Sequence, residues 1–226
     1  STSIGGGVGG SGGHGGAAAV KISGGIIKTG SIGGGTTLNP SGSLGYATAD
    51  ITGGDISGQF IMAKGATNPC YFKMSGGVLH GVDTINGTDY DYSNKNGAAV
   101  FMDDPSGTVE IIGGIVENCF AESGGAIYMT AGTVTLKDSG VIQNCRSTQD
   151  GGAIYLGGGT VLMFGGTIRN CSVDEYGGAI YVTGGSVEMS GGTIENCSAK
   201  TGGGIYVNGG DFSMSGGFLR KNTATE

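Results

Sequence analysis

Four cysteines recur at a constant spacing in the second half of the chain. They are Cys119, Cys145, Cys171 and Cys197, each 26 residues from the next. Thiols at one spacing could form disulfides or hold a metal ion. In parallel strands stacked ~4.8 Å apart, however, equivalent side chains point side by side rather than toward one another. Because no histidine accompanies the four cysteines, we predict a ladder of buried free thiols rather than a metal site.

An asparagine precedes each of these cysteines, at Asn118, Asn144, Asn170 and Asn196. Asparagine tolerates the left-handed backbone conformation, and its amide can bond to its own copy above and below. The spacing therefore predicts a structural asparagine ladder at a corner. The remaining cysteine, Cys70, alternates with Phe72 and Met74, which places it in the core of a different strand.

The acidic residues show no catalytic arrangement. Glycoside hydrolysis needs two carboxylates across the scissile bond, and the only adjacent aspartate pair is Asp103–Asp104. Together with Asp89 and Asp91 they are weak candidates for Ca²⁺ ligands, but no calcium-loop spacing is present, and a solvated acidic loop is favoured. We predict no catalytic residue, no cofactor and no metal site.

The elements that would position these residues repeat every 25–27 positions. The runs GAAVFM (97–102), GGAIYM (124–129), GGAIYL (151–156), GGAIYV (177–182) and GGGIYV (202–207) open successive copies. In each copy a second run alternates apolar and polar residues, as in Val134-Thr135-Leu136. Such alternation is typical of a strand with one buried face, and no stretch shows a helical period.

Three short strands per copy, joined by turns too short for a crossover helix, predict an all-β, single-stranded parallel β-helix of about eight coils. We treat 1–226 as one domain. Residues 97–226 form regular repeats, whereas 1–96 form irregular coils with a glycine-rich start and an insertion near 84–96. The insertion is a candidate binding loop. Because both ends are abrupt, we expect a fragment of a larger protein whose flanking domains cover the open terminal coils.

One aromatic residue per copy forms a further column, at Phe101, Tyr128, Tyr155, Tyr181 and Tyr206. Each lies beside an inward aliphatic residue, so the aromatic side chains should point outward. Two interpretations stay open: a self-stacked or covered aromatic ladder, and a strip that binds sugar rings or a partner protein.

Composition excludes several classes of protein. The chain has 53 glycines, 37% hydrophobic residues, 13% charged residues and a net charge of −7. Glycine lacks a three-residue period, which argues against collagen, and the acidic balance argues against nucleic-acid binding. No run of 18 apolar residues or signal peptide is present, so we predict no membrane insertion in this segment.

The GGAIY runs and FLRKN (218–222) are similar to the GGAI and FxxN repeats of chlamydial polymorphic membrane proteins. The repeats also resemble the right-handed parallel β-helix superfamily that includes pectate lyases. The likeness covers 97–226 well and 1–96 loosely. It departs from the FxxN pattern in two respects: the repeats that end in Asn-Cys lack the phenylalanine, and Lys221 in FLRKN occupies the place of the expected asparagine. Polygalacturonases of this fold pair Asp-Asp with a later Gly-His-Gly, whereas here Gly13–Gly15 precedes Asp103.

The resemblance implies a bacterial surface protein, extracellular or cell-surface in location. We therefore expect a non-catalytic segment that acts as an adhesin-like binding module or a structural stalk, with a host glycan or surface protein as its partner. The alternative is a carbohydrate-active β-helix enzyme, a lyase or hydrolase, or its glycan-binding module.

Overall fold

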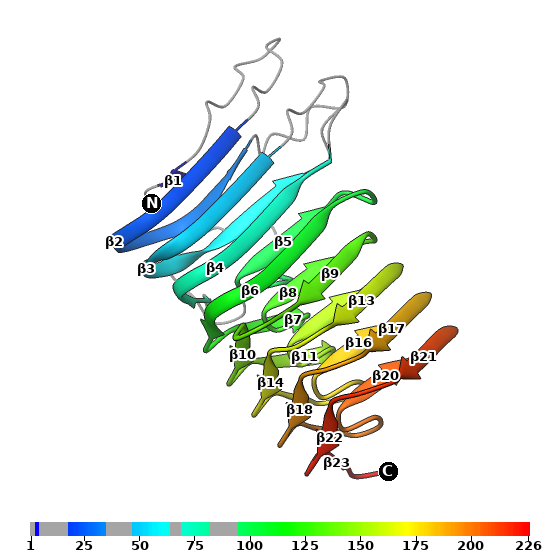
Figure 1. Ribbon diagram of the computed structural model, residues 1–226. Helices are drawn as coiled ribbons and strands as arrows, with labels where there is room; N and C mark the ends of the chain where they lie inside the picture. Colours follow the sequence, from blue (N-terminus) through cyan, green and yellow to red (C-terminus); the bar gives the residue numbers. More distant parts are fainter. Residues whose placement is uncertain (1–2, 5–17, 35–46, 64–68, 82–94) are drawn as a thin grey trace.

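A computed structural model describes residues 3–4, 18–34, 47–63, 69–81 and 95–226. Within these ranges the regular structure is entirely β, and strands of successive turns stack in parallel (Figure 1). No helix that could span a membrane occurs in these ranges. The predicted fold class is confirmed: the chain is a parallel β-solenoid with a period of about 26 residues.

Most strands join one sheet of 18 strands that wraps around the core. It contains β1 (Ser3–Ile4), β2 (Ala18–Gly34), β3 (Ala47–Ala63), β4 (Tyr71–His80), β5 (Val100–Asp103), β6 (Thr108–Glu117), β8 (Ile127–Met129), β9 (Thr133–Leu136), β10 (Val141–Gln143), β12 (Ile154–Leu156), β13 (Gly159–Met163), β14 (Thr167–Arg169), β16 (Ile180–Val182), β17 (Gly185–Met189), β18 (Thr193–Glu195), β20 (Ile205–Val207), β21 (Gly210–Met214) and β22 (Phe218–Arg220).

A second sheet of five strands was not predicted. It contains β7 (Phe120–Ser123), β11 (Arg146–Asp150), β15 (Ser172–Val173), β19 (Ser198–Ala199) and β23 (Thr223–Ala224). A regular turn therefore has four short strands rather than three. The fourth is two to five residues long, too short to show clear alternation in the sequence.

The structure has about six turns rather than the eight predicted. The prediction took each glycine corner as one complete turn. A glycine corner lies on only one side of the coil, however, and a full turn also needs the strands of the other sides. The number of corners therefore exceeded the number of full turns.

Inward side chains form columns along the solenoid axis. In one column Val109, Val134, Val161 and Val187 stack in register and are each 0% exposed. Burying such a side chain contributes ~1.5–3 kcal/mol, and each turn depends on its neighbours for this burial. The alternation in the sequence is therefore the pattern that specifies the core.

The chain changes direction at a glycine corner between strand segments of the wrapped sheet. Gly77 there has a φ of 84°, and a Cβ on this residue would lie 2.7 Å from the backbone of Gly53 and Gly54. Only glycine fits such an approach without strain. The one turn that departs from the pattern places Asp138 at a φ of 45° at this corner, which aspartate tolerates better than most residues.

A second corner of each turn carries the predicted asparagines. Asn118, Asn144, Asn170 and Asn196 have φ between 54° and 56°. The Asn170 side chain donates a hydrogen bond to the Asn144 Oδ1 at 3.3 Å. Lys221 occupies the same place in the last turn, with a φ of 54°. The repeat thus uses the left-handed conformation to turn the chain, and asparagine adopts it at little cost.

Gln59 completes the stack of GGAIY corners at its first level. Backbone N–H groups connect later corners, as in the bond from Gly97 to the Ser123 carbonyl. The 0%-exposed Gln59 donates from Nε2 to the carbonyls of Asn96 and Gly97 at 2.8 and 3.0 Å. A side-chain amide therefore takes the place of the backbone donors that an earlier corner would supply.

Candidate functional site: an aromatic ladder on one face

The outward aromatic residues lie in register on β5, β8, β12, β16 and β20. Phe101 pairs with Tyr128, and the pairing continues through Tyr155 and Tyr181 to Tyr206. Their neighbours along the strand point inward; Ile127 and Met129, for example, are both 0% exposed. The alternation of the strand thus places every ring on the same outer face.

The rings stack on one another. Neighbouring centroids are 5.5, 4.7, 5.4 and 5.6 Å apart, and interplanar angles range from 5° to 29°. Rings lying side by side in one plane could not approach so closely, so neighbours meet face to face with an offset. The faces of Tyr128, Tyr155 and Tyr181 are therefore occupied by other rings of the column.

This geometry bears on the two interpretations of the column. The self-stacked ladder is the arrangement observed. Binding by the strip stays a prediction, and it would have to use ring edges and phenolic hydroxyls rather than free ring faces. Tyr176, which the sequence analysis did not single out, adds a ring at one end, with its centroid 4.9 Å from that of Tyr206.

Polar groups border the ladder. Asn208 donates to the Tyr181 hydroxyl at 3.5 Å. Burial, followed by the charge of Asp103, raises the pKa of Tyr128, and burial is also the main cause of the raised pKa of Tyr155. Burial and the nearby Glu175 raise the pKa of Asp150. The phenols of Tyr128 and Tyr155 are therefore neutral at pH 7, and the surrounding rim is acidic.

The thiol ladder shows no sign of reactivity. All five cysteines are buried and outside any disulfide, and each thiol of the ladder donates to the carbonyl two residues earlier, at 3.1–3.4 Å. Burial raises the pKa of Cys145 and Cys171, and the neighbouring Cys171 thiol, then burial, raise the pKa of Cys197. Protonated thiols are poor nucleophiles and metal ligands.

The aspartates proposed as weak calcium ligands do not form one site. Asp104 is 2% exposed and accepts hydrogen bonds from the backbone N–H groups of Cys70 and Ser106 at 2.7 and 2.9 Å. It therefore fixes the corner before β6, while Asp103 is exposed. Asp89, Asp91 and the insertion near 84–96, up to residue 94, lie outside the described residues. In the part described, no group of three acidic, histidine or cysteine side chains could hold a metal ion.

A polar ladder runs along the strand position just before the asparagines. His80 lies 3.1 Å from Asp55 and 3.3 Å from Glu117. Gln143 donates to Glu117 at 2.6 Å and accepts from Arg169 at 2.7 and 2.9 Å. The sequence analysis missed this ladder, although E, Q, R and E precede the four asparagines in the repeats. Such exposed pairs favour the correct register and contribute little stability.

A second polar cluster lies on β4 and β6 and just after β9. The Tyr71 hydroxyl donates to Glu110, and the Lys137 Nζ lies 3.1 Å from Glu110 Oε1. Burial and then the Glu110 hydrogen bond raise the pKa of Tyr71 to about 12, while the Tyr71 hydrogen bond lowers the pKa of Glu110. At neutral pH the phenol stays protonated and the carboxylate ionised. Neither group is therefore poised to exchange a proton at that pH.

No family model, curated protein or solved structure matches the chain. The resemblance to pectate-lyase-like and GGAI-repeat proteins is therefore carried by the short motifs alone.

Proposed function

We propose that this chain is a non-catalytic segment of a bacterial cell-surface protein, a stiff stalk that carries an adhesive strip along its aromatic ladder. The observation that carries the proposal is the unbroken column of five aromatic residues on the outer face of consecutive turns. An outward column that is aromatic at five consecutive levels, from Phe101 to Tyr206, goes beyond what the core requires. Tyrosine is also among the residues most enriched in binding surfaces.

Ligand chemistry follows from the part of the ladder that stays accessible. Ring edges and neutral phenols offer hydrogen bonds to hydroxyl-rich surfaces, whereas occupied ring faces offer little stacking. The acidic groups Asp103, Asp150 and Glu175 around the ladder repel polyanions. These features favour a neutral glycan or an uncharged patch of a host surface protein over a polyuronide.

An extracellular location suits the thiols, even though free cysteines are uncommon in oxidising compartments. Their burial limits oxidation, and the raised pKa of Cys145, Cys171 and Cys197 keeps these three thiols protonated, whereas the thiolate is the reactive form. The solenoid therefore does not need disulfides to persist outside the cell.

Binding to a panel of neutral and acidic glycans and to host-protein panels tests the proposal. We expect binding to neutral glycans or to a host protein, weakened roughly tenfold or more by Tyr155→Ala and Tyr181→Ala. Tyr155→Phe keeps the ring stack and removes one hydroxyl, so it separates hydrogen bonding from loss of packing. Phe164→Ala, at an exposed side chain outside the ladder, is the matched control.

Two results would count against adhesion. Binding that survives both alanine variants would place the adhesive surface elsewhere. Binding to no member of either panel would leave only the role of a structural stalk. Turnover of a polyuronide, lost in Asp103→Asn, would instead support the alternative of a carbohydrate-active enzyme.

A further inference from the structure

The tyrosines of the aromatic ladder form a row that runs along the solenoid axis, with one phenol per turn. Tyr128, Tyr155, Tyr181 and Tyr206 pair in register on consecutive turns, and parallel strands lie ~4.8 Å apart. Their ring centroids are 4.7–5.6 Å apart, which leaves no gap in which a sugar ring could insert between two neighbours. A ligand of the ladder therefore has to lie along the row of ring edges and hydroxyls.

A polar column runs beside this row of phenols. Each of its residues follows a tyrosine of the ladder by two positions, and its backbone N–H bonds to a carbonyl of the preceding turn: Thr130, Gly157, Thr183 and Asn208. The column therefore shares the register of the ladder. Asn208 donates to the hydroxyl of Tyr181 at 3.5 Å. Because that bond uses the phenol as an acceptor, the O–H of Tyr181 can still donate to a ligand.

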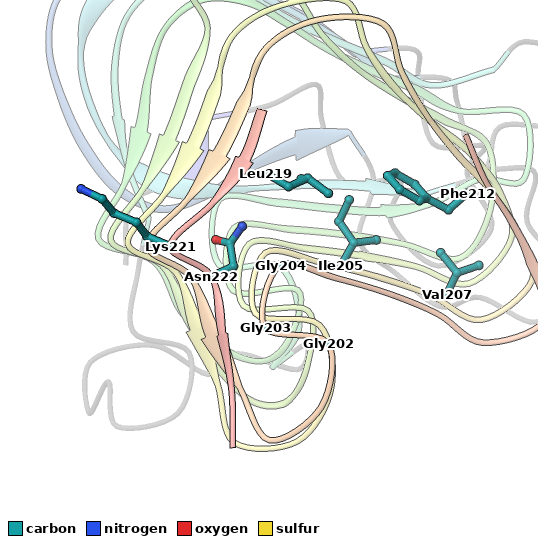
Figure 2. Close-up of a pocket in the computed structure, with 9 residues that line it drawn as sticks. All are labelled: Gly202, Gly203, Gly204, Ile205, Val207, Phe212, Leu219, Lys221 and Asn222. Carbon is teal, nitrogen blue, oxygen red and sulfur yellow. The ribbon is translucent and has the colours of Figure 1, made fainter. Parts of the chain in front are cut away.

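A pocket in the last turn lies on the other side of β20 from the ladder. Figure 2 shows this open pocket, of about 460 Å³, with Ile205 and Val207 among its lining residues. Both are direct neighbours of Tyr206 along β20, but Tyr206 itself does not line the pocket. A glycan on the ladder gains no enclosing walls from it. The affinity of such a ligand therefore has to accumulate from many weak contacts along the row.

Acidic groups near the row restrict the charge of the ligand. Burial is the main cause of the raised pKa of Tyr128 and Tyr155, and the charges of Asp103 and Asp150, respectively, contribute to it. Both carboxylates therefore lie close enough to the row to act on its phenols. Carboxylates in this position repel polyanions, which favours an uncharged chain rich in hydroxyl groups.

We propose that the ligand of the ladder is a linear chain of neutral, β-1,4-linked sugars that lies parallel to the solenoid axis, with about one sugar per turn. A β-1,4-linked pyranose chain is extended, and each sugar advances it by a distance close to the ~4.8 Å between neighbouring strands. Successive sugars therefore meet successive phenols. An α-1,4-linked chain of the same sugars curves and leaves the row. This inference rests on the adhesive role proposed above and adds the shape and direction of the ligand.

NMR titration of the folded chain with sugars of defined length and linkage tests this inference. The probes are cello- and manno-oligosaccharides, which are neutral and β-1,4-linked. In at least one of these series we expect the Kd to fall about fivefold for each added sugar, up to the four sugars that match the four tyrosines of the row. Maltotetraose, the α-1,4-linked counterpart of cellotetraose, should bind no more tightly than maltose.

Tyr155→Phe keeps the stacked ring and removes one hydroxyl from the middle of the row. We expect this variant to bind the four-sugar chain about fivefold more weakly than the wild type does. Tyr71→Phe is the matched control, because it removes a phenolic hydroxyl on β4, outside the ladder, and it should bind like the wild type. Circular dichroism of each variant verifies that the solenoid is folded.

The results separate this inference from the adhesive role on which it rests. Ladder-dependent glycan binding with one Kd for short and long chains, or for α- and β-linked chains, would overturn the linear ligand and leave the adhesive strip intact. An unchanged Kd in Tyr155→Phe would overturn contact with the row of phenols. Ladder-dependent binding to a host protein and to no glycan would likewise overturn only this inference. If nothing binds to the ladder, both proposals are wrong.

Discussion

Asn222 occupies the position in the last turn that Cys197 occupies in the turn before it. Its Oδ1 accepts a hydrogen bond from the Cys197 backbone N–H at 3.0 Å, and its Nδ2 donates to the Ile194 carbonyl at 2.9 Å. An amide side chain thus ends the column of thiols and satisfies two backbone groups of the preceding turn.

Asn222→Ala should loosen the last turns, because it removes the side-chain hydrogen bonds to the Cys197 N–H and the Ile194 carbonyl. We expect a loss of ~1–3 kcal/mol, seen as faster hydrogen exchange in β18, β19 and β22. Asn208→Ala removes another amide in the last turn whose only described bond is 3.5 Å long, and it should have little effect. Equal loss in both variants would refute the role of Asn222 as a terminator.

Val187→Asp should destabilise strongly, since it places a charge at a fully buried position. We expect a loss of more than ~4 kcal/mol, concentrated in the turns on either side. Glu188→Ala, at the adjacent exposed position, is the control. Thermal denaturation followed by circular dichroism measures both, and a Val187→Asp melting temperature equal to that of the wild type would contradict the stacked-core description.

Gly77→Ala should cost more than ~1 kcal/mol, because the residue has a positive φ and its Cβ would press on the backbone of the previous turn. Gly25→Ala is the matched control: Gly25 also has a positive φ, of 86°, at the same corner position, but no atom lies within 4 Å of its Cβ position. We expect this variant to lose less stability in urea denaturation, because only the backbone strain remains. If the two variants unfold at the same urea concentration, close approach of the turns is not what requires glycine at Gly77.

The free energy of unfolding should fall between about pH 10 and pH 12. Tyr71 has its pKa raised from 10.0 to about 12 by burial and by Glu110, so the unfolded chain loses the phenolic proton first. Its contribution is therefore complete below pH 10 and disappears as the pH passes through 12. Tyr71→Phe should reduce this decline in alkaline denaturation curves. If the free energy of unfolding declines as steeply in Tyr71→Phe as in the wild type, other groups cause the alkaline loss of stability.

Lowering the pH should also destabilise this cluster, through Glu110. Because the Tyr71 hydrogen bond lowers the pKa of Glu110 in the folded state, the unfolded chain takes up that proton first. The stability it contributes is present above the usual carboxyl pKa and is lost as the pH falls below it. Glu110→Gln should make acid unfolding less steep in the same experiment.

Several features of the fold could be predicted because they depend on residues that repeat. The alternation of Val187 and Met189 with polar neighbours marked the buried face, and the 26-residue spacing of the asparagines located the left-handed corner. The same register placed Tyr128 beside Tyr155, although it left open whether their rings stack on each other or bind a ligand. The prediction did not extend to the fourth strand of each turn, such as β15, because a strand of two residues carries no period.

Contacts between side chains that differ from turn to turn were also missed. Gln59 caps the corner stack although its own segment lacks the GGAIY pattern, and Tyr71 meets Glu110 across 39 residues of sequence. The number of turns was wrong for a related reason: glycine corners report one side of the coil and do not show whether the other sides are completed.

The sequence by itself determined that the chain winds into a stack of parallel turns, because period-two alternation and a constant repeat length leave one way to bury the apolar residues together. Only the tertiary structure decided how the outward residues are used. Ring faces that the sequence left available for binding are occupied by neighbouring rings at 4.7–5.6 Å. Repetition fixes which side chains lie over one another, whereas the orientation of a ring depends on neighbours that are distant along the chain.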